Sequence, residues 1–206
     1  ARALRQGDWG SSDARLGIAI AVGTVPVVVA GLLIKLFWPG YETSPLRSVA
    51  SIGIVSIVMA LLLALAERLG QRRKQLPSVQ GIDGVVVGLA QALAIIPGVS
   101  RSGSTLTASL LFGWQRSDAA RFSFLLGIPA ITLAGLVELK GAFAEGSVYG
   151  PLPMLLGILT AAVVSWLAIA WLLKFLQTNS TWPFVIYRLV FGVVLLALVL
   201  ANPTLG

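Results

Sequence analysis

The sequence predicts an all-α polytopic integral membrane protein, because of its composition and the lengths of its apolar runs. Of its 206 residues, 57% are hydrophobic and 11% are charged, whereas a typical soluble domain has about 25% charged residues. The mean hydropathy is +0.91. Five runs approach or exceed the roughly 20 apolar residues that cross a bilayer, and we expect one transmembrane domain over residues 1–206. The five runs are 16–37, 49–66, 122–139, 152–176 and 184–201.

A sixth apolar element, residues 82–114, is interrupted, and we expect it to form a re-entrant helical hairpin. Its first half, Ile82–Ile96, would reach only about 22 Å as a helix, which is less than a hydrocarbon core of roughly 30 Å. Pro97 and Gly98 then end the helix. A hairpin fits these lengths, provided that protein or a water-filled cavity covers its irregular backbone. A single kinked helix that crosses the membrane is the alternative.

The charges of the loops favour the hairpin and orient the chain. Cytoplasmic loops of membrane proteins are enriched in Lys and Arg. The two loops at 38–47 and 140–150 carry only Arg47 and Lys140 as basic residues. A re-entrant segment places the other loop cations together on one side, which is then cytoplasmic; a spanning helix would put the later ones outside. These cations are Arg2, Arg5, Arg15, Arg68, Arg72, Arg73, Lys74, Arg116, Arg121 and Lys174.

Composition also limits the catalytic chemistry and the binding partners that the chain can have. The chain has no cysteine and no histidine, so it lacks thiolates and the commonest acid/base and metal-ligating side chain. The net charge of +7 lies in short loops beside apolar runs, which suits anionic lipid headgroups better than nucleic acid. The polar start without an initiator methionine leads us to expect a chain whose earlier part is absent.

The polar turn between the two halves of the hairpin, from Pro97 to Thr105, is the most informative segment. At membrane depth a guanidinium and several hydroxyls are expensive and mark a functional site. Glycines let backbone N–H groups converge on an anion, and the helix that follows adds the positive end of its dipole. We therefore predict a phosphate site in which Arg101 grips the anion through two hydrogen bonds. Its other members are Gly98, Ser100, Ser102, Gly103, Ser104 and Thr105.

The same turn is one residue away from a P-loop. Residues 98–105 read G-x-x-x-x-G-S-T, but Ser104 stands where a P-loop has lysine, and no strand is expected before the turn. Nucleotide hydrolysis is therefore excluded, although the use of glycine and a helix N-terminus to hold phosphate is shared.

Cleavage of a phosphate bond also needs a base, a nucleophile or metal-binding carboxylates. Asp and Glu number only eight, and none lies in the core of the hairpin. We expect Glu67 and Asp83, at the ends of apolar runs, to be solvated. Glu138 either pairs within the bundle or, as we favour, lies at a helix end near Lys140. The chain thus offers an anion clamp without its acid/base partner.

Three other polar residues lie inside apolar segments. Gln91 either hydrogen-bonds a ligand or bridges two helices. Arg188 either extends to the cytoplasmic headgroups beside Tyr187 or binds an internal anion. Ser123 is a small polar residue of the kind that more often serves helix packing than catalysis.

The sequence resembles the bacterial undecaprenyl-pyrophosphate phosphatases, the bacitracin-resistance membrane proteins. The resemblance rests on residues 88–94 leading into the turn 97–105, on 120–129, on 184–192 and on 23–26. It implies two inverted repeats, each with a re-entrant hairpin, whose tips meet at a cleft facing the periplasm or outside; this chain corresponds to the second half. The family's clamp matches Ser100, Arg101 and Thr105, which we predict to be catalytic. The predicted substrate-binding residues are Gly98, Ser102, Gly103, Ser104 and Gln91.

The resemblance also implies parts that this sequence lacks. The first hairpin of the family carries an E/Q-x-x-x-E motif and a tip with serine and histidine, and neither occurs here. A divalent cation, Mg²⁺ or Ca²⁺, is implied by the resemblance alone, and its ligands are not in this chain, so we predict no metal ligand here. We expect the chain by itself to be inactive.

The expected function is hydrolysis of undecaprenyl pyrophosphate, a C55 polyprenyl pyrophosphate, to undecaprenyl phosphate and inorganic phosphate. This reaction recycles the lipid carrier for peptidoglycan synthesis and confers bacitracin resistance, in the inner membrane of a bacterium. Arg101 would neutralise the charge that develops in the transition state, and Ser100 would orient phosphate or act as nucleophile. The expected partners are the polyprenyl lipid and the bilayer, with no nucleic acid, and a homodimer is left open. A polyprenyl-phosphate transporter or flippase is the alternative, because broken helices with anion sites are typical of transporters.

Overall fold

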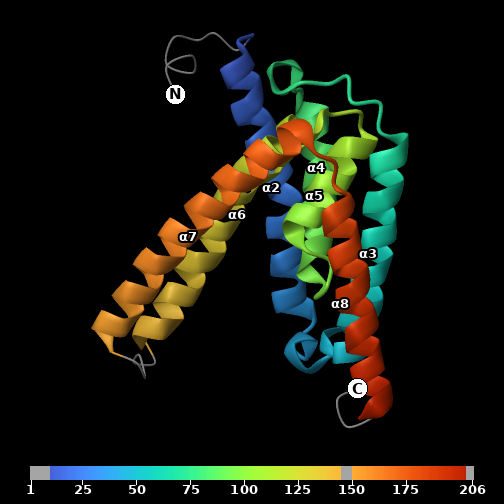
Figure 1. The fold of residues 1–206 in the computed structure, drawn as a ribbon. Coiled ribbons are helices and arrows are strands. Elements are labelled where there is room, and N and C mark those ends of the chain that lie inside the picture. The colour runs from blue at the N-terminus through green and yellow to red at the C-terminus, as the bar shows by residue number, and fades with distance from the viewer. Residues whose placement is uncertain (1–9, 145–149, 203–206) are drawn as a thin grey trace.

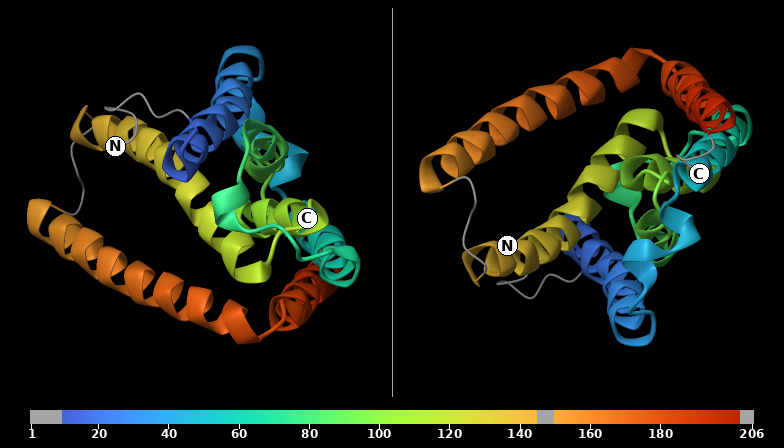
Figure 2. Two further views of the ribbon diagram at one scale, coloured as in Figure 1. Left: turned by 90° about the horizontal axis from the view of Figure 1, so that it is seen from above. Right: turned by 90° about the horizontal axis from the view of Figure 1, so that it is seen from below.

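The computed structural model describes residues 10–144 and 150–202, and over these residues the fold is all-α. Helices α2, α3, α4, α5 and α8 form an upright bundle, from which α6 and α7 extend away together (Figures 1 and 2). The helices are α2 (Ser12–Phe37), α3 (Val49–Leu69), α4 (Gly81–Ala92), α5 (Arg101–Leu111), α6 (Arg116–Ala144), α7 (Pro151–Thr178) and α8 (Trp182–Ala201). The short 3-10 turns are η1 (Tyr41–Thr43), η2 (Pro45–Arg47), η3 (Leu76–Ser78) and η4 (Leu93–Ile95).

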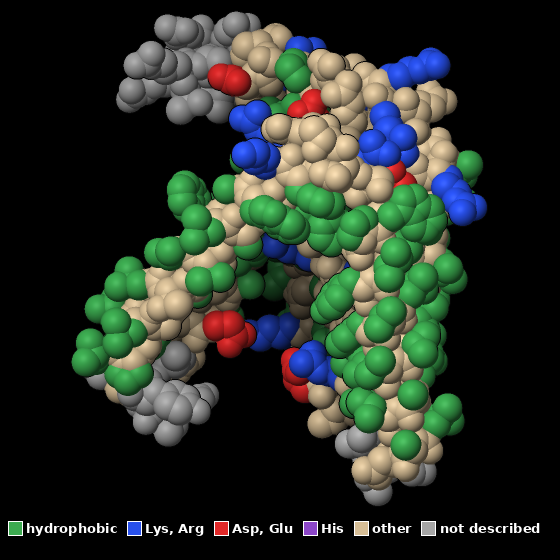
Figure 3. All heavy atoms as spheres, in the orientation of Figure 1, with side chains coloured by type: hydrophobic (Ala, Val, Ile, Leu, Met, Phe, Trp, Pro, Cys, Tyr) green, Lys and Arg blue, Asp and Glu red, His purple; other side chains and the backbone are tan. Residues whose placement is uncertain are grey.

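Five of the described helices, α2, α3, α6, α7 and α8, are long and apolar enough to cross a membrane. They coincide with the five predicted apolar runs, and α6 begins six residues earlier than its run. Many of their large apolar side chains are exposed, and these cover both the bundle and the α6–α7 pair (Figure 3). A helix that is apolar on its outer face as well suits a lipid environment. The prediction of an all-α polytopic membrane protein is confirmed.

Helices α4 and α5 fold back on each other as a hairpin. The indole N–H of Trp114, just after α5, donates to Oδ1 of Asp83 in the first turn of α4 over 3.1 Å. The backbone N–H groups of Arg73 and Lys74 both donate to the carbonyl of Gly113 at 2.8 Å. The start of α4 and the end of α5 therefore lie together. That both ends of this hairpin lie on one side of a bilayer stays a prediction.

Small residues let the helix backbones approach closely where the hairpin packs. A Cβ on Gly23 of α2 would lie 2.6 Å from the carbonyl oxygen of Gly84 in α4, and one on Gly88 would lie 2.6 Å from the Cα of Gly23. Glycines four residues apart are a common contact between membrane helices. On the other side of the bundle, Gly53 of α3 and Gly192 of α8 meet in the same way. These contacts fix the hairpin against α2 and fix α8 against α3.

Two carboxylates that we expected to be solvated are buried. Glu67 is 3% exposed; it is paired with Arg72 and Arg116 and accepts a hydrogen bond of 2.9 Å from Thr181. Asp83 is fully buried and pairs with Lys74. The expectation was wrong because both carboxylates have hydrogen-bonding and ion-pair partners, some of them far along the chain, which satisfy them in place of water.

Candidate functional site

Two residues of the hairpin turn have positive backbone φ angles. Gly98 has φ +90° and Ser100 has φ +63°. A left-handed conformation is unusual for a residue with a side chain, and such residues cluster at functional sites. Ser100 is the N-cap of α5, and its Oγ accepts a hydrogen bond of 3.3 Å from the backbone N–H of Gly103. Serine at this position begins α5 immediately after the turn.

Three side chains from other elements donate hydrogen bonds to backbone carbonyls in the turn or just before it. Tyr41, in the loop after α2, donates its hydroxyl to the carbonyl of Ile95 over 2.5 Å. Ser56 of α3 donates to the carbonyl of Gly98 over 3.4 Å. Arg188 of α8 donates to the carbonyl oxygens of Gly98 and Val99. These bonds fix the position of the turn relative to α3 and α8.

Arg188 is the candidate site residue for which the sequence left two alternatives. Its side chain is only 9% exposed, and its Nη1 lies 3.0 Å from the carbonyl oxygen of Val99. The interpretation in which it extends to headgroups beside Tyr187 was therefore wrong, since Tyr187 is exposed while Arg188 is turned inward. A Cβ on Gly103 would lie 2.6 Å from Arg188 Nη1, so this guanidinium lies directly against the first turn of α5.

Arg101, the central residue of the predicted clamp, has a half-buried side chain that reaches α6. Its guanidinium lies against Gly127, and a Cβ there would be 2.8 Å from its Cζ. Its Nη1 is buried and has no hydrogen-bond partner among the described residues. An unpaired guanidinium donor is costly to bury, which makes Arg101 a candidate ligand-binding residue.

The other predicted residues form two groups in the structure. The first group is buried, and the second lines a cavity. Ser104 and Thr105 are buried, and both donate to the carbonyl of Arg101, over 2.9 and 2.8 Å. Gln91 is fully buried, and neither of its amide atoms has a partner among the described residues. The second group, Gly98, Ser100, Ser102 and Gly103, lines a cavity. The structure thus brings the second group together at one surface and directs the hydroxyls of Ser104 and Thr105 to the backbone.

This cavity has a volume of about 440 Å³ and lies among α3, α5, α6, α7 and α8. Its polar lining consists of the turn, Ser56, Ser123 and Arg188. The large apolar side chains of its lining include Leu63, Leu106, Phe124, Leu172, Leu176, Phe184 and Phe191. No Asp or Glu is among its lining residues, so the charge of Arg188 is not neutralised within the cavity. Such a cavity suits a ligand that has an anionic end and an apolar body.

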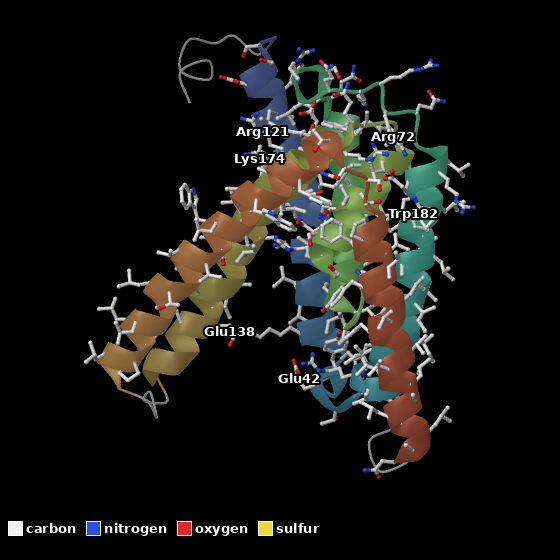
Figure 4. The ribbon with its side chains drawn as sticks, viewed as in Figure 1. Glu42, Arg72, Arg121, Glu138, Lys174 and Trp182 are labelled. Atoms are coloured by element: carbon white, nitrogen blue, oxygen red, sulfur yellow. The ribbon has the colours of Figure 1, made fainter. Side chains whose placement is uncertain are left out.

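Charged residues at the two ends of the molecule are distributed unequally. Arg72, Arg121 and Lys174 lie toward the end at which α4 begins, whereas Glu42 and Glu138 lie toward the opposite end (Figure 4). Glu138 is exposed on α6 and points into the space between α6 and the bundle. The surface is hollowed between the α6–α7 pair and the bundle, and basic side chains are visible inside the hollow (Figure 3).

Comparison with known proteins places the chain in a family. The family model of bacitracin resistance protein BacA matches residues 1–194. An undecaprenyl-diphosphatase of Synechococcus sp. (strain RCC307) is 98% identical over 206 residues, which are the whole of this chain and 72% of that relative. The undecaprenyl-diphosphatase of Parasynechococcus marenigrum (strain WH8102) is 73% identical over 197 residues, 95% of this chain and 69% of the relative. That of Prochlorococcus marinus (strain MIT 9303) is 72% identical over 197 residues, 96% of this chain and 67% of the relative.

Proposed function

The chain belongs to the bacitracin resistance protein BacA family, and we infer that it is a membrane phosphatase that acts on undecaprenyl diphosphate. The reaction cleaves the anhydride bond and gives undecaprenyl phosphate and inorganic phosphate, so the lipid carrier returns to peptidoglycan synthesis. One observation of the structure supports a particular site for this reaction. Serines of the turn line a cavity together with Arg188, and most of the remaining lining of this cavity is apolar.

The described residues can hold a diphosphate through positive charge and donors. Arg101 would bind phosphate oxygens with its unpaired Nη1 and neutralise the charge that develops as the anhydride bond breaks. Ser100, Ser102 and Gly103 at the start of α5 line the cavity, whereas Arg101 is not among its lining residues; at this end of α5 the helix dipole is positive. Ser104 and Thr105 would act through the backbone of Arg101, whose carbonyl accepts both hydroxyls. Ser100 either orients the phosphate or attacks it.

The divalent cation that the family resemblance implies finds no fitting ligand set among the described residues. No three acidic, histidine or cysteine side chains gather anywhere in the described part of the chain. The buried carboxylates, Glu67 and Asp83, are already paired with basic side chains. We therefore derive no step through a metal, and assign to these residues only the binding and orientation of the diphosphate.

We place the basic end of the molecule, with Arg72, Arg121 and Lys174, in the cytoplasm of a bacterial inner membrane. The hairpin would then enter from the cytoplasmic side, with its turn pointing toward the outer surface. In this orientation the cleft opens to the periplasm or the outside.

The test of this function is release of inorganic phosphate from undecaprenyl diphosphate by the full-length protein in detergent. Replacing Arg101 by alanine should lower kcat by about 100-fold or more, as the loss of a transition-state donor does. The matched control is Arg121→Ala, because Arg121 is exposed on α6, whereas Arg101 has a buried guanidinium nitrogen without a partner among the described residues. Equal release by the Arg101 variant and wild type would contradict the proposal, and so would headgroup translocation in liposomes without any release.

A further inference from the structure

Ser123 of α6 is a buried polar residue that the proposed function leaves unexplained. It is 4% exposed, lines the cavity, and its Oγ has no hydrogen-bond partner among the described residues. A buried helical serine or threonine usually donates to the carbonyl four residues earlier. Thr105, Thr107 and Ser109 of α5 all do so, over 2.7 to 2.8 Å. Ser123 stands apart from them, and a buried hydroxyl without a partner calls for an explanation.

The surroundings of Ser123 are positively charged. Gly127 lies one helical turn further along α6, and residues four apart share a helix face. Since Gly127 contacts the guanidinium of Arg101, Ser123 lies one turn from the unpaired Nη1 of that residue. Arg188 lines the same cavity from α8, and its Nε is also without a partner among the described residues. Ser123 of α6 and Arg188 of α8 thus bring unpaired donors to one cavity, and the unpaired Nη1 of Arg101 lies one turn from Ser123, at Gly127.

The ligand that fits these donors is a phosphate carrying an apolar chain. A serine hydroxyl can donate to a phosphate oxygen, and hydrogen bonds to a charged acceptor are the strong ones. The residues next to Ser123 along α6 that line the cavity, Ala120 and Phe124, are apolar, as are Leu172 and Phe184 beyond them. Ser123 is therefore a polar lining residue with apolar neighbours along α6.

We propose that Ser123 donates a hydrogen bond to a phosphate oxygen of the polyprenyl diphosphate, which makes α6 a third wall of the headgroup site beside α5 and α8. The proposal rests on the proposed function, because it assigns a further residue to the same substrate. It places the headgroup beside Ser123, the turn and Arg188, and the first isoprene units against the apolar lining.

The test compares three variants of the full-length protein with farnesyl diphosphate as substrate. Ser123→Ala should raise KM about tenfold, the effect of losing a hydrogen bond to a charged group, while the Tm in detergent stays unchanged. Ser123→Thr keeps the hydroxyl and should restore KM. Ser109→Ala is the matched control, since Ser109 is equally buried but bonds only to the carbonyl of Thr105. An unchanged KM for Ser123→Ala, or a rise that Ser123→Thr does not reverse, overturns the proposal.

Two further measurements separate this proposal from the function on which it rests. If Ser123 contacts phosphate, its replacement by alanine should raise KM equally for geranyl and farnesyl diphosphate; a rise that depends on chain length would overturn the assignment to the headgroup. If the wild-type protein releases no phosphate, the proposed function fails. Calorimetric binding of farnesyl monophosphate then tests Ser123 by itself. A tenfold higher Kd in Ser123→Ala supports the contact, and an equal Kd refutes it.

Discussion

Replacing Gly127 by alanine should disable the site without harming the fold. In α6, Gly127 is the residue against which the Arg101 guanidinium lies, and a new Cβ would be 2.8 Å from Arg101 Cζ and 3.1 Å from its Nη2. Carbon and nitrogen atoms that are not bonded do not approach so closely, so the flexible arginine must move by about an ångström. A misplacement of about 1 Å at a reacting centre can lower a rate by about 100-fold, which corresponds to about 2.7 kcal/mol of transition-state stabilisation.

The assay is phosphate release from undecaprenyl diphosphate, with the Tm in detergent as the measure of stability. Gly135→Ala is the matched control, because Gly135 is in the same helix and a Cβ there meets nothing within 4 Å. Both changes should keep or raise the Tm, since alanine favours a helix over glycine by up to about 1 kcal/mol. Wild-type kcat in Gly127→Ala would refute the placement of Arg101 against α6, and so would an equal loss in Gly135→Ala.

Three other predictions follow from the contacts of the hairpin. Arg188→Lys should lower kcat about tenfold, because an ammonium cannot bond to both turn carbonyls as the guanidinium fork does; unchanged kinetics would contradict this. Asp83→Asn should reduce the free energy of unfolding by about 3 kcal/mol, the effect of breaking a buried ion pair, and an unchanged Tm would argue against it. Because the chain has no cysteine, single cysteines can be labelled from either side of the membrane. Ser78→Cys and Gln115→Cys should react from one side and Thr43→Cys from the other, whereas a spanning helix would separate the first two.

The membrane fold could be predicted from the sequence because it depends on local properties. An apolar run of about 20 residues is recognisable without knowing its neighbours, and all five runs are helices in the structure. The hairpin turn was equally visible, since Pro97, Gly98 and the polar residues after them are contiguous. The inward bonds of Ser104 and Thr105 could also have been foreseen, because such hydroxyls in a helix often bond to the preceding turn.

What the sequence left undetermined depends on residues far apart in the chain. Glu67 is buried because Arg116 and Thr181, 49 and 114 residues away, supply its hydrogen bonds. Arg188 holds carbonyls 89 and 90 residues away. The only signal for Arg188 was the cost of a cation inside an apolar run, which indicates a partner but does not say which one. The contact of Gly127 with Arg101 had no signal in the sequence, because it depends on the path of another side chain.

The most direct test of the central claim is a structure of the full-length protein with farnesyl monophosphate bound. We predict that the phosphate lies within hydrogen-bond distance, about 3 Å, of the Arg101 guanidinium and the first turn of α5. The farnesyl chain should extend along Phe124, Leu172 and Phe184. A phosphate bound at the basic loops around Arg72 and Arg121, with the cavity beside the hairpin turn unoccupied, would contradict the account.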